Sequence, residues 1–245
     1  MTETYTPSEY SEGYPEGIER HFWHSARNDM IYRQLKTVLQ PDNLILDIGC
    51  GAGVFVDYAQ HKGLNIRGVE KGPAPVKPGL ESIVDTATEL SALAEEIRGE
   101  VRVALLLDVI EHIEDRTRFL SQLRQQLPAC EYLLVTVPAR MEIWSNFDEY
   151  WGHFLRYDRP GLEAELRAAG FAPVKTAYHF NWVYLVSLLM RPLGIKRKTD
   201  FTAPSQHPLE TMLHKLLAWL TGAESRLVPG WVPGSTILCL ARRQP

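Results

Sequence analysis

The 245-residue sequence contains few cysteines, and the three it has, Cys50, Cys130 and Cys239, are far apart and odd in number. Such cysteines build neither the disulfide framework of a small secreted domain nor a zinc site, which needs closely spaced ligand pairs. Free thiols are typical of a reducing compartment, so we expect a cytoplasmic protein.

Features that would mark a secreted, membrane-spanning or nucleic-acid-binding protein are also missing. Residues 1–17 lack the basic start and apolar stretch of a secretion signal. The longest apolar run, around residues 182–190, is shorter than the ~20 residues that a membrane-spanning helix needs. The formal net charge of −4 gives no positive field that would attract nucleic acid, so we expect no nucleic-acid partner.

The composition is otherwise that of an ordinary folded protein. Hydrophobic residues make up 45% of the chain and charged residues 23%, which is the balance of a globular domain. A chain of this length can bury a sizeable core without disulfides. We expect a single domain, because no linker-like stretch separates two parts of the sequence.

Strands and helices are expected to alternate along the chain, which predicts an α/β fold with a doubly wound parallel sheet. Short apolar runs predict strands at residues 44–48, 64–69, 80–84, 101–107, 132–137, 171–178 and 236–241. Apolar residues at helical spacing predict helices at residues 18–39, 54–61, 89–98, 113–127 and 160–169. The aromatic and acidic stretch 138–158 is expected to form a loop or cap.

Residues 180–230 interrupt this alternation with an aromatic segment, a basic turn and an amphipathic helix at residues 209–220. One face of that helix carries an apolar stripe of Leu209, Met212, Leu213, Leu216, Leu217 and Leu220. In one interpretation the helix is a cap on the sheet and the stripe is buried. In the other, this surface contacts lipid or accepts an apolar chain, as amphipathic helices with Trp and Lys/Arg do, and the protein sits peripherally on the inner face of the membrane.

A glycine-rich turn, Asp47-Ile48-Gly49-Cys50-Gly51-Ala52-Gly53, joins the first buried strand to a helix. Glycines there let the backbone approach a ligand closely, and the start of the helix supplies free amide donors. The spacing is Gly-x-Gly-x-Gly, which differs from the Gly-x-Gly-x-x-Gly of dinucleotide sites.

Two acidic residues give this turn its specificity. Asp47 precedes the first glycine, where its charge disfavours a phosphate and favours a cationic ligand with ammonium and sulfonium groups. Glu70 ends the next strand, where an acid accepts the two hydroxyls of a ribose. A turn that serves only strand-to-helix geometry would explain the glycines but neither acid. The pattern therefore predicts a site for a nucleoside that carries a sulfonium.

The stretch ILDIGCGAG resembles the first motif of class I S-adenosylmethionine-dependent methyltransferases, and Glu70 matches the acid of their second motif. The stretch LLLDVIEHIED at residues 105–115 is similar to the fourth-strand motif of the branch that resembles ubiquinone-biosynthesis-type and bacterial small-molecule methyltransferases. The resemblance implies a Rossmann-like sheet of seven strands, mostly parallel with an antiparallel last strand, and a helical insertion.

The order of the expected elements also divides one domain, residues 1–245, into four parts. It predicts an arm at residues 1–17 that is mobile or folds over a ligand, and a cofactor-binding core at 18–178. A helical cap or insertion follows at 179–232, and the last strand lies within 233–245.

In such enzymes the cofactor is S-adenosylmethionine and its product is S-adenosylhomocysteine. The resemblance implies contacts to the methionine moiety from Asp47, Gly49, Cys50, Gly51, Gly53, Asp108, Val109 and Ile110. It implies contacts to the nucleoside from Glu70, Lys71, Asp85 and Thr86. The stretch IERHFWHSARN resembles a segment of bacterial members in which Trp23 would close the pocket and Arg27 would pair with the methionine carboxylate.

Two histidines are candidates for the general base that a hydroxyl acceptor needs. His112 follows the fourth strand and His153 follows the fifth, and both loops are expected at the same edge of the sheet. Either histidine is instead a structural residue if a backbone carbonyl satisfies it. Glu111, His112 and Glu114 are possible ligands of a divalent ion, but neighbouring polar residues at a helix start are typical of a solvated cap, so we expect no metal.

The expected function is methyl transfer to an oxygen of a small or lipid-linked molecule, such as a sugar, a quinone-like ring or a polyprenyl-linked compound. The alternatives are a nicotinamide-dependent oxidoreductase and a non-catalytic cofactor-binding module with the same fold. Methylation of nucleic-acid bases is disfavoured, because the fourth strand is followed by Asp108-Val109-Ile110-Glu111 rather than an Asn-Pro-Pro-Tyr-like segment.

Overall fold

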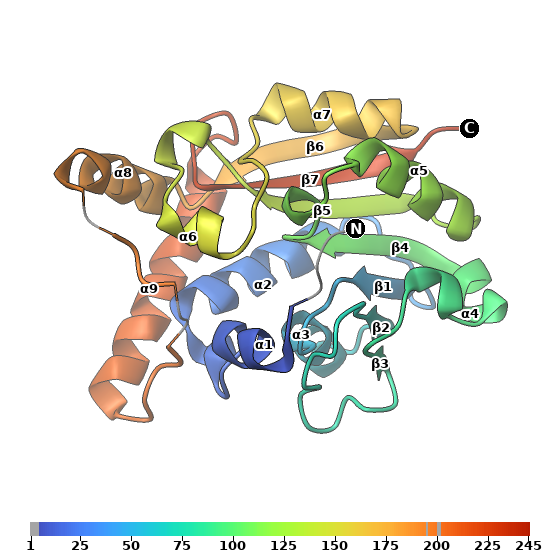
Figure 1. The fold of residues 1–245 in the computed structure, drawn as a ribbon, viewed down its shortest axis with the longest axis horizontal. Helices are drawn as coiled ribbons and strands as arrows, with labels where there is room; N and C mark the ends of the chain where they lie inside the picture. Colours follow the sequence, from blue (N-terminus) through green and yellow to red (C-terminus); the bar gives the residue numbers. More distant parts are fainter. Residues whose placement is uncertain (1–4, 195, 200–201) are drawn as a thin grey trace.

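The computed structural model describes residues 5–194, 196–199 and 202–245, and its centre is a twisted sheet (Figure 1). The strands are β1 (Leu44–Ile48), β2 (Ile66–Val69), β3 (Val84–Asp85), β4 (Val101–Leu107), β5 (Tyr132–Pro138), β6 (Phe171–His179) and β7 (Thr236–Arg243). Their order is β3-β2-β1-β4-β5-β7-β6, and β7 runs antiparallel to both of its neighbours. The predicted seven-stranded, mostly parallel sheet with an antiparallel last strand is confirmed.

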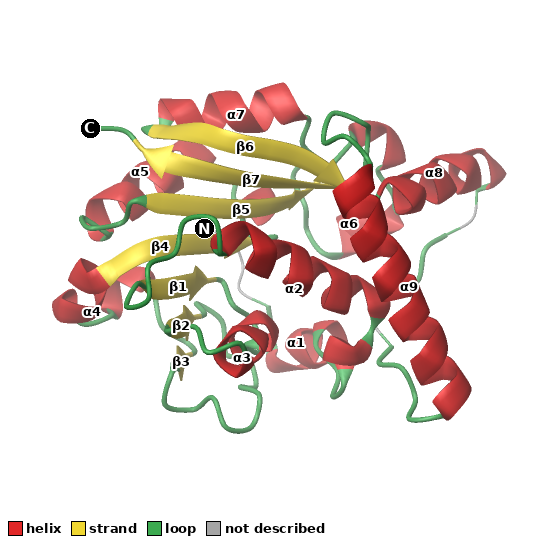
Figure 2. Ribbon diagram, turned by 180° about the vertical axis from the view of Figure 1, so that it is seen from behind, coloured by secondary structure: helices red, strands yellow, loops and turns green. Residues whose placement is uncertain are grey.

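Helices cover both faces of the sheet (Figures 1 and 2). They are α1 (Pro7–Gly13), α2 (Phe22–Leu35), α3 (Val54–His61), α4 (Glu95–Glu100), α5 (Arg116–Gln126), α6 (Asn146–Tyr150), α7 (Arg159–Ala168), α8 (Asn181–Met190) and α9 (Pro208–Leu227). Short 3-10 turns lie at Ile18–Arg20, Leu90–Ala92, Ile110–His112, Met141–Ile143 and Arg191–Leu193.

Two hydrophobic cores lie on opposite faces of the sheet because side chains alternate along each strand. In β1, Leu44, Leu46 and Ile48 pack with the apolar faces of α5 and α7. Ile45 points the other way and packs with α2 and α3. The sheet is therefore buried on both faces, as its continuous apolar strands predict.

Several element boundaries differ from the sequence-based expectation. The helix expected at 18–39 is a 3-10 turn followed by α2, because extended His21 ends the turn and its ring accepts the Trp23 N–H as the N-cap. The strand expected at 80–84 is only the two paired residues of β3, which lies at the edge of the sheet. The helix expected at 89–98 is divided between a 3-10 turn and α4.

The insertion forms α8 and α9, which lie together at one end of the molecule (Figures 1 and 2). The interpretation that buries the apolar stripe of α9 is wrong. Exposed side chains in the stripe include Leu209, Met212, Leu213, Leu216 and Leu220. Within the described ranges, the structure contains no helix long and apolar enough to cross a bilayer.

The central strand β4 provides a direct test of the core. Leu105 is completely buried there, so Leu105→Ala should lower the free energy of unfolding by about 2–5 kcal/mol, the cost of a large-to-small change in a packed core. The measurement is urea denaturation followed by far-ultraviolet circular dichroism. Arg102→Ala, at an exposed position of the same strand, should change the free energy by no more than ~0.5 kcal/mol. Equal losses in both variants would contradict this packing.

Candidate functional site

A cavity of about 780 Å³ lies at the carboxyl ends of the central strands. It lies beside the ends of the adjacent strands β1 and β4. From β1 the following strands are added toward one edge of the sheet and from β4 toward the other, and such a point is the usual ligand site of an open α/β sheet. The predicted site residues that line it are Trp23, Arg27, Asp47, Gly49, Cys50, Glu70, Lys71, Asp108, Val109, His112 and His153. Those that lie outside its lining are Gly51, Gly53, Asp85, Thr86 and Ile110.

The glycine turn between β1 and α3 has backbone angles that require glycine. Gly49, Gly51 and Gly53 all have positive φ values, of 76°, 55° and 83°. A Cβ atom on Gly49 would lie 2.7 Å from the Val109 side chain. The turn therefore places backbone atoms of Gly49, with no side chain over them, at the wall of the cavity.

Glu70 is held by three donors at the end of β2. Its carboxylate accepts the N–H of Gly51 at 2.9 Å, the N–H of Gly72 at 3.0 Å and the hydroxyl of Tyr10 at 2.8 Å. The Gly51 bond joins the carboxylate to the glycine turn and the Gly72 bond joins it to the segment after β2, while Tyr10 belongs to the N-terminal arm. A diol that binds Glu70 must share the carboxylate with Tyr10 or displace it.

Asp47 is a buried carboxyl group with an unfilled acceptor. It is 1% exposed, and its Oδ1 atom has no hydrogen-bond partner among the residues that the structure describes. Burial raises the pKa of Asp47 to about 7, against the lowering effect of Arg27. A cation beside this oxygen would satisfy it and favour the ionised form. The residue therefore fits an ammonium or sulfonium group.

Arg27 already has an acidic partner in the cavity wall. Its guanidinium lies 2.6 Å from Asp108 and donates to the hydroxyl of Thr136, and its Cζ atom stands 5.1 Å from the centre of the Trp23 ring. The Nε donor is buried with no partner within the described chain. The Nε–H of Arg27 can therefore donate to a carboxylate, but Asp108 already balances much of the positive charge of Arg27.

The N-terminal arm covers the cavity with three tyrosines that the sequence did not assign to the site. Thr6 caps α1 by accepting the Glu9 N–H, and the Tyr10 hydroxyl reaches Glu70. A Cβ atom on Gly51 would lie 2.6 Å from the Tyr14 ring, so that ring packs directly on the glycine turn. Tyr5 donates to the Trp151 carbonyl at 2.5 Å. The signal was the run of tyrosines in an otherwise polar arm.

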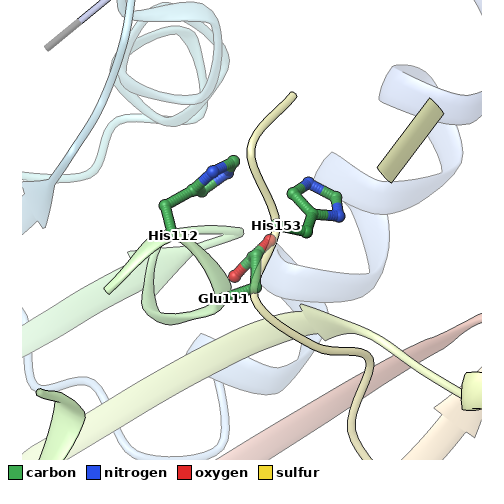
Figure 3. Close-up of side chains that lie close together, drawn as sticks. All are labelled: Glu111, His112 and His153. Carbon is green, nitrogen blue, oxygen red and sulfur yellow. The ribbon is translucent and has the colours of Figure 1, made fainter. Parts of the chain in front are cut away.

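Glu111, His112 and His153 lie close together, as Figure 3 shows, and the Tyr5 hydroxyl of the arm is 3.0 Å from Nδ1 of His112. One ligand-type atom from each lies within 4.8 Å of the others. His153 takes the place that the sequence gave to Glu114, which is exposed and lies outside the cluster. This geometry fits proton transfer, and it also fits coordination of a divalent cation.

Asp148 orients His153, a partnership that the sequence did not reveal. The Nδ1 atom of His153 lies 2.9 Å from the carboxylate of Asp148, which also pairs with Arg156 at 2.7 Å. Burial opposes ionisation of Asp148, but the bonds from His153 and Arg156 outweigh it and lower its pKa to about 2. The fixed anion holds the proton of His153 on Nδ1 and leaves Nε2 as an acceptor.

Burial disfavours the charged forms of the other two residues of the cluster. Burial, and then the neighbouring His153, lower the pKa of His112 to about 3. Burial and the nearby Asp108 raise the pKa of Glu111 well above its ordinary value. Because His112 binds a proton so weakly, it is a poor base, whereas His153 has an anionic partner.

The cavity wall after β3 lies further along the chain than Asp85 and Thr86, the two residues that the resemblance assigned to the nucleoside. Asp85 forms an ion pair with Arg67 at 3.4 Å, and the cavity wall after β3 is made by residues 88–91. The sequence missed this wall because β3 is too short to set the register. An adenine contact from Asp85 or Thr86 stays a prediction.

Comparisons with known proteins agree with this architecture. A family model described as a methyltransferase domain matches residues 21–176, more than half of the chain. The sphingolipid C9-methyltransferase A of Emericella nidulans is 28% identical over 56% of this chain and 31% of its own length. The ubiquinone biosynthesis O-methyltransferase of Pseudomonas aeruginosa is 33% identical over 29% of this chain and 34% of its own length. The chain thus matches about a third of each of these relatives.

A solved structure extends the likeness in fold. The 1,6-didemethyltoxoflavin-N1-methyltransferase of Burkholderia thailandensis, with bound substrate and S-adenosylhomocysteine, aligns with a TM-score of 0.54 and 17% identity. The alignment covers 97% of this chain and 85% of that one. The predicted Rossmann-like methyltransferase fold is confirmed.

Asp47→Asn tests the cationic subsite. The substitution should weaken S-adenosylhomocysteine binding by roughly tenfold to a hundredfold at pH 7.5, because it removes a charge-assisted partner of the ammonium group. Since the free carboxyl has a pKa of about 7, wild-type binding must release its proton below that pH. Wild-type affinity should therefore fall as the pH drops from 7.5 to 5.5, whereas the variant should show little of this dependence. Calorimetry measures both, and identical pH profiles would refute the assignment.

Removal of residues 1–14 tests the arm as a cover. The truncated protein should release S-adenosylhomocysteine ~tenfold faster or more, because loss of covering contacts acts mainly on dissociation. Stopped-flow tryptophan fluorescence measures the rate. Tyr10→Phe is the control, because it removes one hydrogen bond and keeps the arm. An unchanged rate in the truncated protein would show that the arm does not retain the ligand.

Proposed function

This chain belongs to the family of methyltransferase domains, and we propose that it transfers the methyl group of S-adenosylmethionine to a hydroxyl oxygen of a small or lipid-linked molecule. The observation that carries the choice of oxygen is the pair of His153 and Asp148 at 2.9 Å in the wall of the cavity. A hydroxyl acceptor needs such a base, whereas a carboxylate acceptor does not.

The residues of the cavity fit both the methionine end and the nucleoside end of S-adenosylmethionine. The unfilled acceptor of Asp47 suits a positively charged group, and Glu70 directly follows β2, where it can accept ribose hydroxyls. The same unpaired carboxyl disfavours a pyrophosphate, which argues against the nicotinamide-dependent alternative. Bound S-adenosylmethionine supplies an electrophilic methyl group on a sulfonium, so the protein mainly has to align the acceptor.

His153 accounts for the proton in the proposed reaction. Asp148 holds Nδ1, so Nε2 can take the proton of the acceptor hydroxyl as the oxygen forms its bond to the methyl carbon. The sulfur of the bound cofactor would keep the electron pair of the carbon–sulfur bond, and the released proton would reside on His153. The anionic Asp148 stabilises the imidazolium formed, which is the role of a base-orienting acid.

The walls of the cavity support an acceptor with an apolar part. A second groove of about 380 Å³ adjoins the cavity, and the two share Phe22, Val183 and Arg197. Its other lining residues include Trp182, Val186 and Met190 of α8. The names of two relatives, a sphingolipid methyltransferase and a ubiquinone biosynthesis enzyme, point to the same class of molecule.

The acceptor class is tested with labelled cofactor. Incubation with cell extracts split into lipid, sugar and quinone fractions should place the label in the lipid or quinone fraction, on a group stable to mild base as an ether is. A base-labile label would identify a carboxylate acceptor and overturn the oxygen–base pairing. Label in none of the fractions would favour a non-catalytic cofactor-binding module.

His153→Ala should lower kcat by about 10²–10⁴-fold, the contribution of a general base, with little change in cofactor affinity. Asp148→Asn should also lower kcat, because it removes the anion that holds His153. His61→Ala, which alters an exposed histidine of α3, is the control and should leave turnover unchanged. Turnover is measured with and without a chelator. Loss of activity on chelation, restored by a divalent cation, would replace the base mechanism with metal coordination.

A further inference from the structure

Helix α9 packs on the protein through its polar face. Thr221 is completely buried, Ser225 accepts a hydrogen bond from Arg33 of α2 at 2.8 Å, and the His214 ring accepts the Phe22 N–H at 3.1 Å. The apolar face points outward and carries Leu209, Met212, Leu213, Leu216, Trp219, Leu220 and Leu227, which are 46–81% exposed. This arrangement is the reverse of a helix that covers a core.

Helix α8 adds exposed apolar side chains beside this face. It contains no charged residue, and its exposed side chains include Leu185, Leu188 and Leu189, with Leu193 following in the next turn. The indole of Trp182 at the start of α8 donates to Thr221 of α9 at 3.1 Å, so the start of α8 contacts α9. We call the exposed side chains of α8, the turn Arg191–Leu193 and α9 the apolar end of the molecule; both helices are seen together in Figure 1.

The segment that contains the apolar end carries a net positive charge, whereas the rest of the chain carries a net negative charge. Residues 181–231 contain six basic and three acidic residues, a net charge of +3, in a chain whose net charge is −4. The remainder of the molecule therefore carries −7. Exposed cations around the apolar end include Arg191, Lys196, Lys198, Lys215 and Arg226. A negatively charged surface would attract this end and repel the rest.

We propose that the apolar end docks on the surface of an anionic lipid bilayer. The exposed leucines enter the boundary between headgroups and acyl chains, Trp219 lies at the same level, and the cations meet the headgroups. A second copy of this chain fits the apolar end less well than an anionic bilayer does, because a two-fold contact would bring one positive surface against another. The inference does not depend on which molecule accepts the methyl group.

The test uses the full-length protein and vesicles of phosphatidylcholine alone or with phosphatidylglycerol. Co-sedimentation should show binding to the mixed vesicles that is at least about tenfold stronger than to the neutral ones, and 1 M salt should weaken it because charges are then screened within ~3 Å. Equal binding to both vesicles, or binding to neither, would overturn the proposal.

Matched variants separate this surface from a general effect of charge. Trp219→Glu should lower binding to the mixed vesicles by about tenfold or more, and Lys215→Ala by roughly fivefold. Val174→Glu, at an equally exposed apolar position of β6, adds the same charge elsewhere and should change binding less than about twofold. Circular dichroism checks that each variant is folded. Equal losses in Trp219→Glu and Val174→Glu would contradict the assignment.

Sedimentation velocity without lipid tests whether a second copy of this chain binds the apolar end. The wild-type protein should remain one species over a wide range of concentration. A concentration-dependent dimer that Trp219→Glu abolishes would assign the apolar end to a contact between copies and refute docking on lipid.

Discussion

The proposed site depends on one interaction, between a positively charged ligand and the carboxyl group of Asp47, which is buried near the end of β1. Asp47, Glu70 and Asp108 follow or end three neighbouring strands, and Arg27 pairs with only one of them, at 2.6 Å. Glu70 accepts the N–H of Gly51 in the glycine turn, whereas Oδ1 of Asp47 has no partner among the described residues. In the proposed site, a buried carboxyl group without a partner is energetically costly until a cation lies beside it, and this cost would favour a sulfonium compound over a phosphate.

Local patterns predicted much of this arrangement. The glycine turn and both acids could be identified because each lies at the end of an apolar strand, and parallel strands bring their carboxyl ends to one edge. The partner of His153 could not be identified, because Asp148 and Arg156 meet it only after the chain has folded around α6. The tyrosines of the arm escaped assignment for another reason. Their contacts to Glu70 and Gly51 join residues far apart in the sequence.

Helix α9 shows a different limit of sequence patterns. Helical spacing identifies an apolar face, but it does not say whether that face meets the sheet or the solvent. The contacts of Thr221 and Ser225 decide it, since small polar side chains occupy the interface with α2. The same end of the molecule is linked to the cavity through α8, where Val183 lines both the cavity and the groove and Leu185 is exposed. An acceptor drawn from a membrane would thus have a short path to His153.

A crystal structure of the complex with S-adenosylmethionine tests the central interaction most directly. The account predicts that the ammonium or sulfonium group lies against the Asp47 carboxylate and that the ribose hydroxyls lie on Glu70. A cofactor bound in the opposite direction, with adenine beside Asp47 and no cation within hydrogen-bond distance of it, would contradict the account.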